Sequence, residues 1–244
     1  ASPPLPVQSA ALLRYQGIML VRAITKHQPD FLASHPAVLA VLVSAWSSPE
    51  RFHRLSPAHQ MATPPEQLQE TKVLIKCLLS CLRHQASSYS EAPLEPSLAR
   101  LLFLLLSIFS SHTLVSYHFL KAFYADEVAK GYSVAQKAAV LSYFLEWFPQ
   151  SSVPQEDKVH ALQLIILPML QSSFDAGTGG AILTQGVITG IVSTLLGGEQ
   201  LTSYAESLRI ELLKLSTLLI EHASEQLVDR RKELIKFSWN HLKS

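Results

Sequence analysis

Hydrophobic residues recur along nearly the whole chain at spacings of three and four, and strict alternation of apolar and polar residues is almost absent. This period is typical of amphipathic α-helices rather than of strands. We expect nine or ten helices, at about 8–27, 37–46, 66–84, 98–109, 117–130, 132–148, 154–174, 181–198, 203–223 and 228–243. The sequence therefore predicts an all-α protein.

The predicted helices follow one another mostly as sequential pairs. Pairs that repeat every ~35–45 residues are typical of an α-solenoid of HEAT/TPR-like antiparallel helical hairpins, and this is the fold class we predict. The proline-rich stretches Ser47–Pro65 and Ser87–Pro96 are expected to be connections between helices. No initiating methionine is present, and the last helical pattern runs to Ser244. We expect 1–244 to be a single helical-repeat segment and a fragment of a much larger chain.

Several residues mark expected helix ends. Ser133 with Gln136, and Ser203 with Glu206, have the spacing of a capping box, in which two side chains bond the first free backbone amides of a helix. Gly131 is a suitable C-terminal cap. These signals predict helix starts near Ser133 and Ser203.

The segment from Val159 to Phe174 carries no formal charge, which is compatible with a membrane span, a buried strand or an interior helix. A span needs about 20 apolar residues, and this run is shorter and contains several polar side chains. The acidic residues Glu156 and Asp157 suit the first turn of a helix. We predict a helix buried between neighbouring helices, with a kink at Pro168, which lacks an amide hydrogen.

The composition of the chain argues against several classes of function. The formal net charge is +1, and charged residues make up only 16% of the chain, so no global field would recruit nucleic acid or an anionic membrane. The two cysteines, Cys77 and Cys81, lie four residues apart with His84 three further on. A structural zinc site needs four ligands, so we interpret the cysteines as reduced core residues.

Other chemical motifs are weak. The glycine-rich stretch Gly177–Gly180 lacks the lysine and hydroxyl residue of a phosphate-binding loop, and it is interpreted as an inter-helix loop. No hydrolase, metalloprotease or kinase signature is present. We therefore predict no enzymatic activity, no catalytic residue, no metal and no cofactor.

One basic cluster stands out near the C-terminus. Arg230, Arg231, Lys232 and Lys236 are interleaved with apolar residues, and they are our candidate partner-binding residues. A solvated face of an amphipathic helix is the simpler interpretation, and phosphate contact with nucleic acid is a further one. The hypothesis to test is that these residues bind a protein partner.

Four stretches resemble a known family: "LVRAITKHQPDFLASHPAV", "FLKAFYADEVAKGYSVAQKAAVLSYFLEWF", "EDKVHALQLIILPMLQSSF" and "SLRIELLKLSTLLIEHASEQLVDRRKELIKFSWNHL". In order, they are similar to the helical-repeat region of the TRRAP family, the pseudokinase scaffolds of histone acetyltransferase co-activator complexes such as SAGA. The similarity extends from about Leu20 to Leu242 and is weakest in the two proline-rich connections.

The resemblance implies a nuclear, non-catalytic scaffold of a transcription co-activator. Its expected partners are transcription activators, other subunits of an acetyltransferase complex and neighbouring repeats of the same chain, with no membrane and no direct nucleic acid contact. The alternative is a segment of a HEAT-repeat nuclear transport receptor. Such receptors often carry acidic inner surfaces, whereas this chain is charge-balanced.

Overall fold

The computed structural model describes residues 7–47, 65–110, 118–196, 203–228 and 230–242. All regular secondary structure in these residues is helical, and no strand occurs among them, which confirms the predicted all-α class. The described residues form two compact units, one up to Ser88 and the other from Tyr89 onward. That 1–244 forms one continuous repeat segment stays a prediction, and most of the Ser47–Pro65 connection lies outside the described residues.

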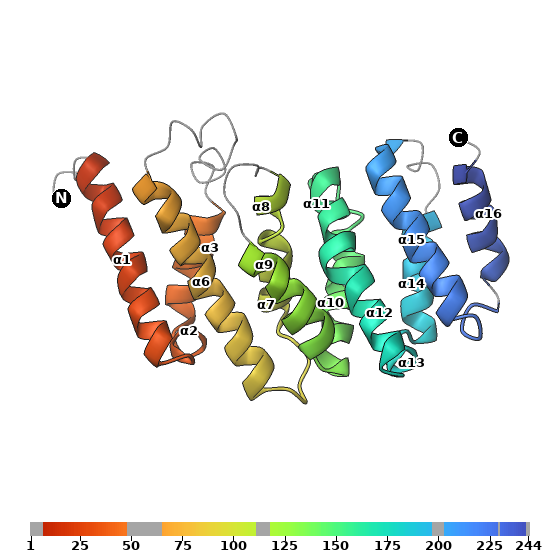
Figure 1. Ribbon diagram of the computed structural model, residues 1–244, viewed down its shortest axis with the longest axis horizontal. Coiled ribbons are helices and arrows are strands. Elements are labelled where there is room, and N and C mark those ends of the chain that lie inside the picture. The colour runs from red at the N-terminus through yellow and green to blue at the C-terminus, as the bar shows by residue number, and fades with distance from the viewer. Residues whose placement is uncertain (1–6, 48–64, 111–117, 197–202, 229, 243–244) are drawn as a thin grey trace. The chain divides into compact units, whose positions relative to one another are not determined.

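The first unit contains α1 (Val7–His27), α2 (Phe31–Ser34), α3 (Pro36–Trp46) and α6 (Pro65–Ser88). Helices α1 and α6 run side by side, with α2 and α3 packed against α6 (Figure 1). Arg14 of α1 bonds the buried carboxylate of Glu70 at 2.9 Å, and Arg22 Nη1 donates to Ser80 Oγ at 3.1 Å. The contact between α1 and α6 is therefore partly polar.

The hydrophobic spacing of this first helix predicts an apolar side made of Leu12, Leu13, Met19, Leu20, Ala23 and Ile24, but that is not the side that is buried. Ile18 and Thr25 are buried, whereas Leu12, Leu13 and Leu20 are exposed. The reason is that Arg14 and Arg22 find partners on α6, so the stripe that contains them faces inward. Periodicity located this helix correctly but gave the wrong orientation.

The second unit holds the remaining helices, with two π-helical segments labelled η. They are α7 (Pro96–Leu104), α8 (Ser107–Ser110), α9 (His118–Ala122), η1 (Phe123–Gly131), α10 (Val134–Trp147), α11 (Gln155–Ala161), η2 (Leu162–Ile166), α12 (Leu167–Asp175), α13 (Gly179–Ile182), α14 (Gln185–Leu196), α15 (Glu206–His222) and α16 (Arg231–Leu242). They form two rows, one of α9–η1, α11–η2–α12 and α15, the other of α7, α10, α14 and α16 (Figure 1). Two rows of sequential helices are the arrangement expected of an α-solenoid.

The uncharged segment Val159–Phe174 is an interior helix, as predicted. Ile165, Ile166, Met169 and Leu170 are fully buried, and the helix contacts η1 on one side and α15 on the other. Among the residues that the structure describes, none of the helices combines the length and apolarity that a membrane crossing requires. Contact with neighbours on several sides explains why the segment carries no charge.

The irregularity around Pro168 takes the form of a π-helical turn. Proline has no amide hydrogen, and its ring crowds the carbonyl one turn earlier. Directly before it, the Leu167 amide donates to the Leu162 carbonyl, five residues back, and η2 ends there. The other π-helical segment, η1, contains no proline, so a π-helical turn in this fold does not require one, and the predicted kink at Pro168 stays a prediction.

Helix caps were predicted with mixed success. Ser133 and Gln136 form the expected capping box, with bonds of 3.3 and 3.0 Å. The Ser203–Glu206 box was wrong, because α15 begins after Ala205. The Ala205 amide instead donates to Gln155 Oε1 at 2.7 Å, and Gln155 Nε2 donates to the Ser203 carbonyl at 3.1 Å. A side chain from α11 thus bonds the backbone at the start of α15, where the sequence predicted the Ser203–Glu206 box.

Glycines shape the turn after α12. Gly177 has a φ of 72°, and it is the only residue with a positive φ in the described part of the chain. The Gly177 amide donates to the Phe174 carbonyl and the Thr178 amide to the Ser173 carbonyl, which is a Schellman motif. The glycine-rich stretch is therefore a helix stop and a tight turn, as interpreted from the sequence. Gly131 also ends its helix, but without the left-handed conformation of such a cap.

Replacing Gly179 with alanine should destabilise the second unit. A Cβ atom there would overlap the Phe174 ring, which stacks on His222 with centroids 4.7 Å apart. Such overpacking costs ~1–3 kcal/mol in a close-packed interior. We expect Gly179→Ala to lower the free energy of unfolding by about this amount in urea denaturation.

Gly186→Ala is the matched control. Gly186 lies in the first turn of α14, and a Cβ there meets nothing within 4 Å. Alanine should raise stability by ~0.5–1 kcal/mol, because glycine loses more chain entropy in a helix. Equal unfolding midpoints for the two variants would show that the Phe174 contact does not restrict Gly179.

Candidate protein-binding surfaces

The two cysteines are core residues of the first unit. Cys77 and Cys81 lie on α6, are buried and form no disulfide. Burial raises the pKa of each thiol to about 11, although the Arg22 guanidinium and a hydrogen bond with Thr25 partly oppose this for Cys77. His84 is only half-buried, with Nδ1 3.3 Å from Ser88 Oγ. In the described ranges, no three His, Cys, Asp or Glu side chains gather as a metal site would require.

The predicted basic cluster lies at the start of α16. Arg231, Lys232 and Lys236 are exposed on the helix. Arg230 lies in the turn before it, where its Nη1 is 2.9 Å from Glu233 Oε2. The structure therefore gathers three of the four predicted cations on the helix, and Arg230 is engaged in an ion pair.

Apolar side chains share the exposed side of this helix. Leu234 and Phe237 are buried, but Ile235 and Trp239 are 50% and 59% exposed. Together with Arg231, Lys232 and Lys236, they form what we call the α16 face. Exposed aromatic residues and arginine are enriched in protein-binding surfaces, so Trp239 and Arg231 are the residues that mark this face as a candidate.

A second surface is a groove between two neighbouring helices of the other row. It has a volume of about 450 Å³ and is bounded by η2 and α12 on one side and by α15 on the other. The residues that line it are Gln163, Leu167, Pro168, Gln171, Glu211, Lys214 and Leu218. We call it the α12–α15 groove. A hollow of about 360 Å³ shares Lys214 and Leu218 with it and continues along α15.

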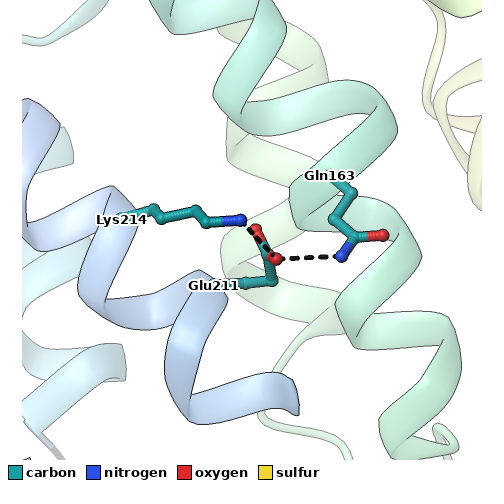
Figure 2. A network of polar contacts seen from close by, with 3 residues as sticks. All are labelled: Gln163, Glu211 and Lys214. Carbon is teal, nitrogen blue, oxygen red and sulfur yellow. Dashed lines mark hydrogen bonds and ion pairs between the residues drawn. The ribbon is translucent and has the colours of Figure 1, made fainter.

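A buried carboxylate organises this groove. Glu211 is only 3% exposed, and its Oε1 accepts hydrogen bonds from Gln163 Nε2 at 2.8 Å and from Lys214 Nζ at 2.9 Å (Figure 2). Lys214 itself is largely exposed, so the ammonium reaches the carboxylate from the solvent side. A buried charge is tolerated when charged hydrogen bonds compensate its lost hydration.

This network could not be predicted from the sequence. Glu211 and Lys214 are three residues apart on one helix, a spacing that is common for pairs on a solvated surface. Gln163 lies 48 residues away in the sequence, and only the packing of α15 against η2 brings it near. No local pattern in the sequence marks Glu211 as buried.

Two other buried charges have internal partners. Lys137 Nζ donates to Ser173 Oγ at 3.2 Å, and Lys158 Nζ lies 5.2 Å from the centroid of the Phe148 ring. Burial lowers the pKa of both lysines. Because their side chains are almost inaccessible, we assign them to packing rather than to partner binding.

Comparison with known proteins gives a consistent result. The family model described as the Tra1 HEAT repeat ring region matches residues 5–244. "Probable transcription-associated protein 1" of Dictyostelium discoideum is 32% identical over 240 residues, which cover 96% of this chain and 5% of that protein. The "Transformation/transcription domain-associated protein" of Homo sapiens is 30% identical over 244 residues, which cover 93% of this chain and 6% of the human protein. No solved structure matches the chain.

The buried thiols generate a prediction about alkaline stability. Their folded pKa of about 11 lies above the ordinary value of 9.0 for a thiol in the unfolded chain, so the folded state keeps protons that the unfolded state releases. The stabilisation is complete below pH 9 and is lost as the pH rises towards 11. We expect the unfolding free energy to fall between pH 8.5 and about 11 more steeply in the wild type than in the Cys77→Ala/Cys81→Ala variant.

Urea denaturation at several pH values measures both slopes. The comparison cancels the contributions of buried tyrosines and lysines, which both proteins share. Parallel slopes in the two proteins would contradict burial of the thiols.

Proposed function

Because the chain belongs to the family of the Tra1 HEAT repeat ring region, we propose that it is a non-catalytic scaffold segment of a transcription co-activator subunit. The family match over residues 5–244 carries this proposal. The chain spans only 5–6% of the length of the relatives named above, so their overall role is extended here by inference. The segment would act by mediating protein–protein contacts.

The partners follow from the same inference. The relatives are named for transcription, which supports a nuclear location. The place in a histone acetyltransferase complex of the SAGA type rests on the resemblance of the sequence to the TRRAP family. Other subunits of that complex, transcription activators and neighbouring repeats of the same chain would cover the exposed helix surfaces. The alternative, a nuclear transport receptor, finds no support among the matched relatives.

The α16 face is the surface we assign to acidic activator segments. Its residues Arg231, Lys232 and Lys236 are exposed and surround the half-exposed Ile235 and Trp239. Disordered acidic segments lose chain entropy when they dock, so they bind weakly and need apolar anchors. Opposite charge mainly accelerates the encounter. A basic rim around apolar residues supplies both the apolar anchors and the opposite charge.

The complex can be tested by purification. An affinity tag on the parent protein should recover acetyltransferase subunits from nuclear extract. Recovery of the transport GTPase Ran in their place would contradict the co-activator role and favour the transport alternative.

Charge reversal on α16 tests the docking hypothesis. We expect the Arg231→Glu/Lys232→Glu/Lys236→Glu variant to associate about tenfold or more slowly with an acidic activation segment, because steering is inverted. Stopped-flow fluorescence measures the association rate. The wild-type rate should fall as salt rises, since exposed charges are screened beyond about 8 Å at physiological ionic strength.

The control reverses three exposed lysines elsewhere, Lys26, Lys76 and Lys130. It changes the net charge by the same amount and should affect the association rate much less. Circular dichroism checks that both variants fold. Equal association rates for the two triple variants would assign the α16 cations to a solvated face without a docking role.

A further inference from the structure

The α12–α15 groove presents hydrogen-bond acceptors without matching donors. Glu211 Oε1 takes both bonds described above, and its Oε2 accepts none from the described residues. Gln163 and Gln171 use their amide nitrogens on Glu211 and Asp175, which leaves their carbonyl oxygens available in the same groove. A ligand that supplies donors would complete this set.

The groove also offers apolar area beside these acceptors. Leu167, Pro168 and Leu218 line it, and the adjoining hollow adds Leu213 and Ile210, which is 45% exposed. Acceptors next to aliphatic side chains suit a peptide that carries hydrogen-bond donors next to aliphatic side chains.

The charges around the groove favour a cationic ligand. Two carboxylates are present, Glu211 in the groove and Glu221 in the adjoining hollow. The only cation in the two linings taken together is Lys214. Lys214 is largely exposed and held at a single oxygen, so an incoming cation can share or replace its contact. The balance is opposite to that of the α16 face.

We propose that the α12–α15 groove binds a partner-protein segment in which an arginine or lysine lies next to aliphatic side chains. The cation bonds Glu211, and the aliphatic groups pack on Leu167, Pro168 and Leu218. Arginine is the better fit, because its planar guanidinium can donate to the carboxylate and to an amide oxygen together. This surface and its ligand are independent of acidic segments at the α16 face.

Methyl NMR of the 244-residue chain tests the proposal with two capped peptides. One is acetyl-Ala-Leu-Arg-Ala-Leu-Ala-amide, and the other carries glutamate in place of the arginine. The arginine peptide should shift the methyl signals of Leu167, Leu213 and Leu218 at millimolar concentration, and the glutamate peptide should bind more weakly. Signals that stay in place, or equal binding of both peptides, would overturn the proposal.

Two substitutions give effects of opposite sign. Glu211→Gln keeps the size of the side chain and a hydrogen-bonding oxygen but removes the charge. It should lower the affinity for the arginine peptide about tenfold. Lys214→Met removes the competing ammonium and should tighten binding severalfold. A purely structural role for the network predicts no change in either affinity, and that result would also overturn the proposal.

Glu225→Gln is the matched control, because this exposed glutamate lies in the turn beyond α15 and not in the groove. Its affinity for the arginine peptide should equal that of the wild type. If Glu211→Gln does not fold, Lys214→Met decides the matter: tighter binding supports the proposal, and unchanged binding refutes it.

Discussion

The structure of the second unit depends on one helix that is buried on several sides. The segment α11–η2–α12 packs between η1 and α15, and its residues Ile165, Ile166, Met169 and Leu170 are inaccessible to water. Burial on this scale supplies the main favourable free energy of folding. It also explains why Val159–Phe174 carries no formal charge. The π-helical turn η2 lies directly before Pro168 in this buried segment.

The same burial makes polar side chains dependent on distant partners. Glu70, Glu211 and Lys137 are almost inaccessible, and each contacts a group on another helix: Arg14, Gln163 and Ser173. An unpaired buried charge is costly, so these contacts restrict which helices can lie next to each other. Gln155 does the same for the backbone by capping α15 from α11. Polar groups thus select the register in which apolar surfaces meet.

The difference between local spacing and contacts with distant partners explains what could be predicted from the sequence. The approximate positions of most helices, the Ser133 cap and the interior helix at Val159–Phe174 follow from local spacing and were confirmed. Helix α2 and the breaks after Leu104 and Ile182 were not predicted. The inward face of α1, the start of α15 and the buried state of Glu211 depend on partners 48 to 58 residues away, and local spacing contains no information about them. The exposure of Arg231, Lys232 and Lys236 could be predicted from the sequence, because charged side chains of an amphipathic helix are rarely buried.

The two candidate surfaces are linked by α15. Glu211 and Lys214 of this helix line the groove, while Ser216 shares a 3.0 Å hydrogen bond with Ser238 of α16. The formal net charge of +1 conceals this arrangement, because it sums 20 basic and 19 acidic residues over the whole chain. Local fields, and not the total, steer partners at contact distance, since salt screens the rest. The two proposed binding surfaces would therefore let a charge-balanced helical segment discriminate between partners of opposite charge on neighbouring helices, a property that composition alone does not reveal.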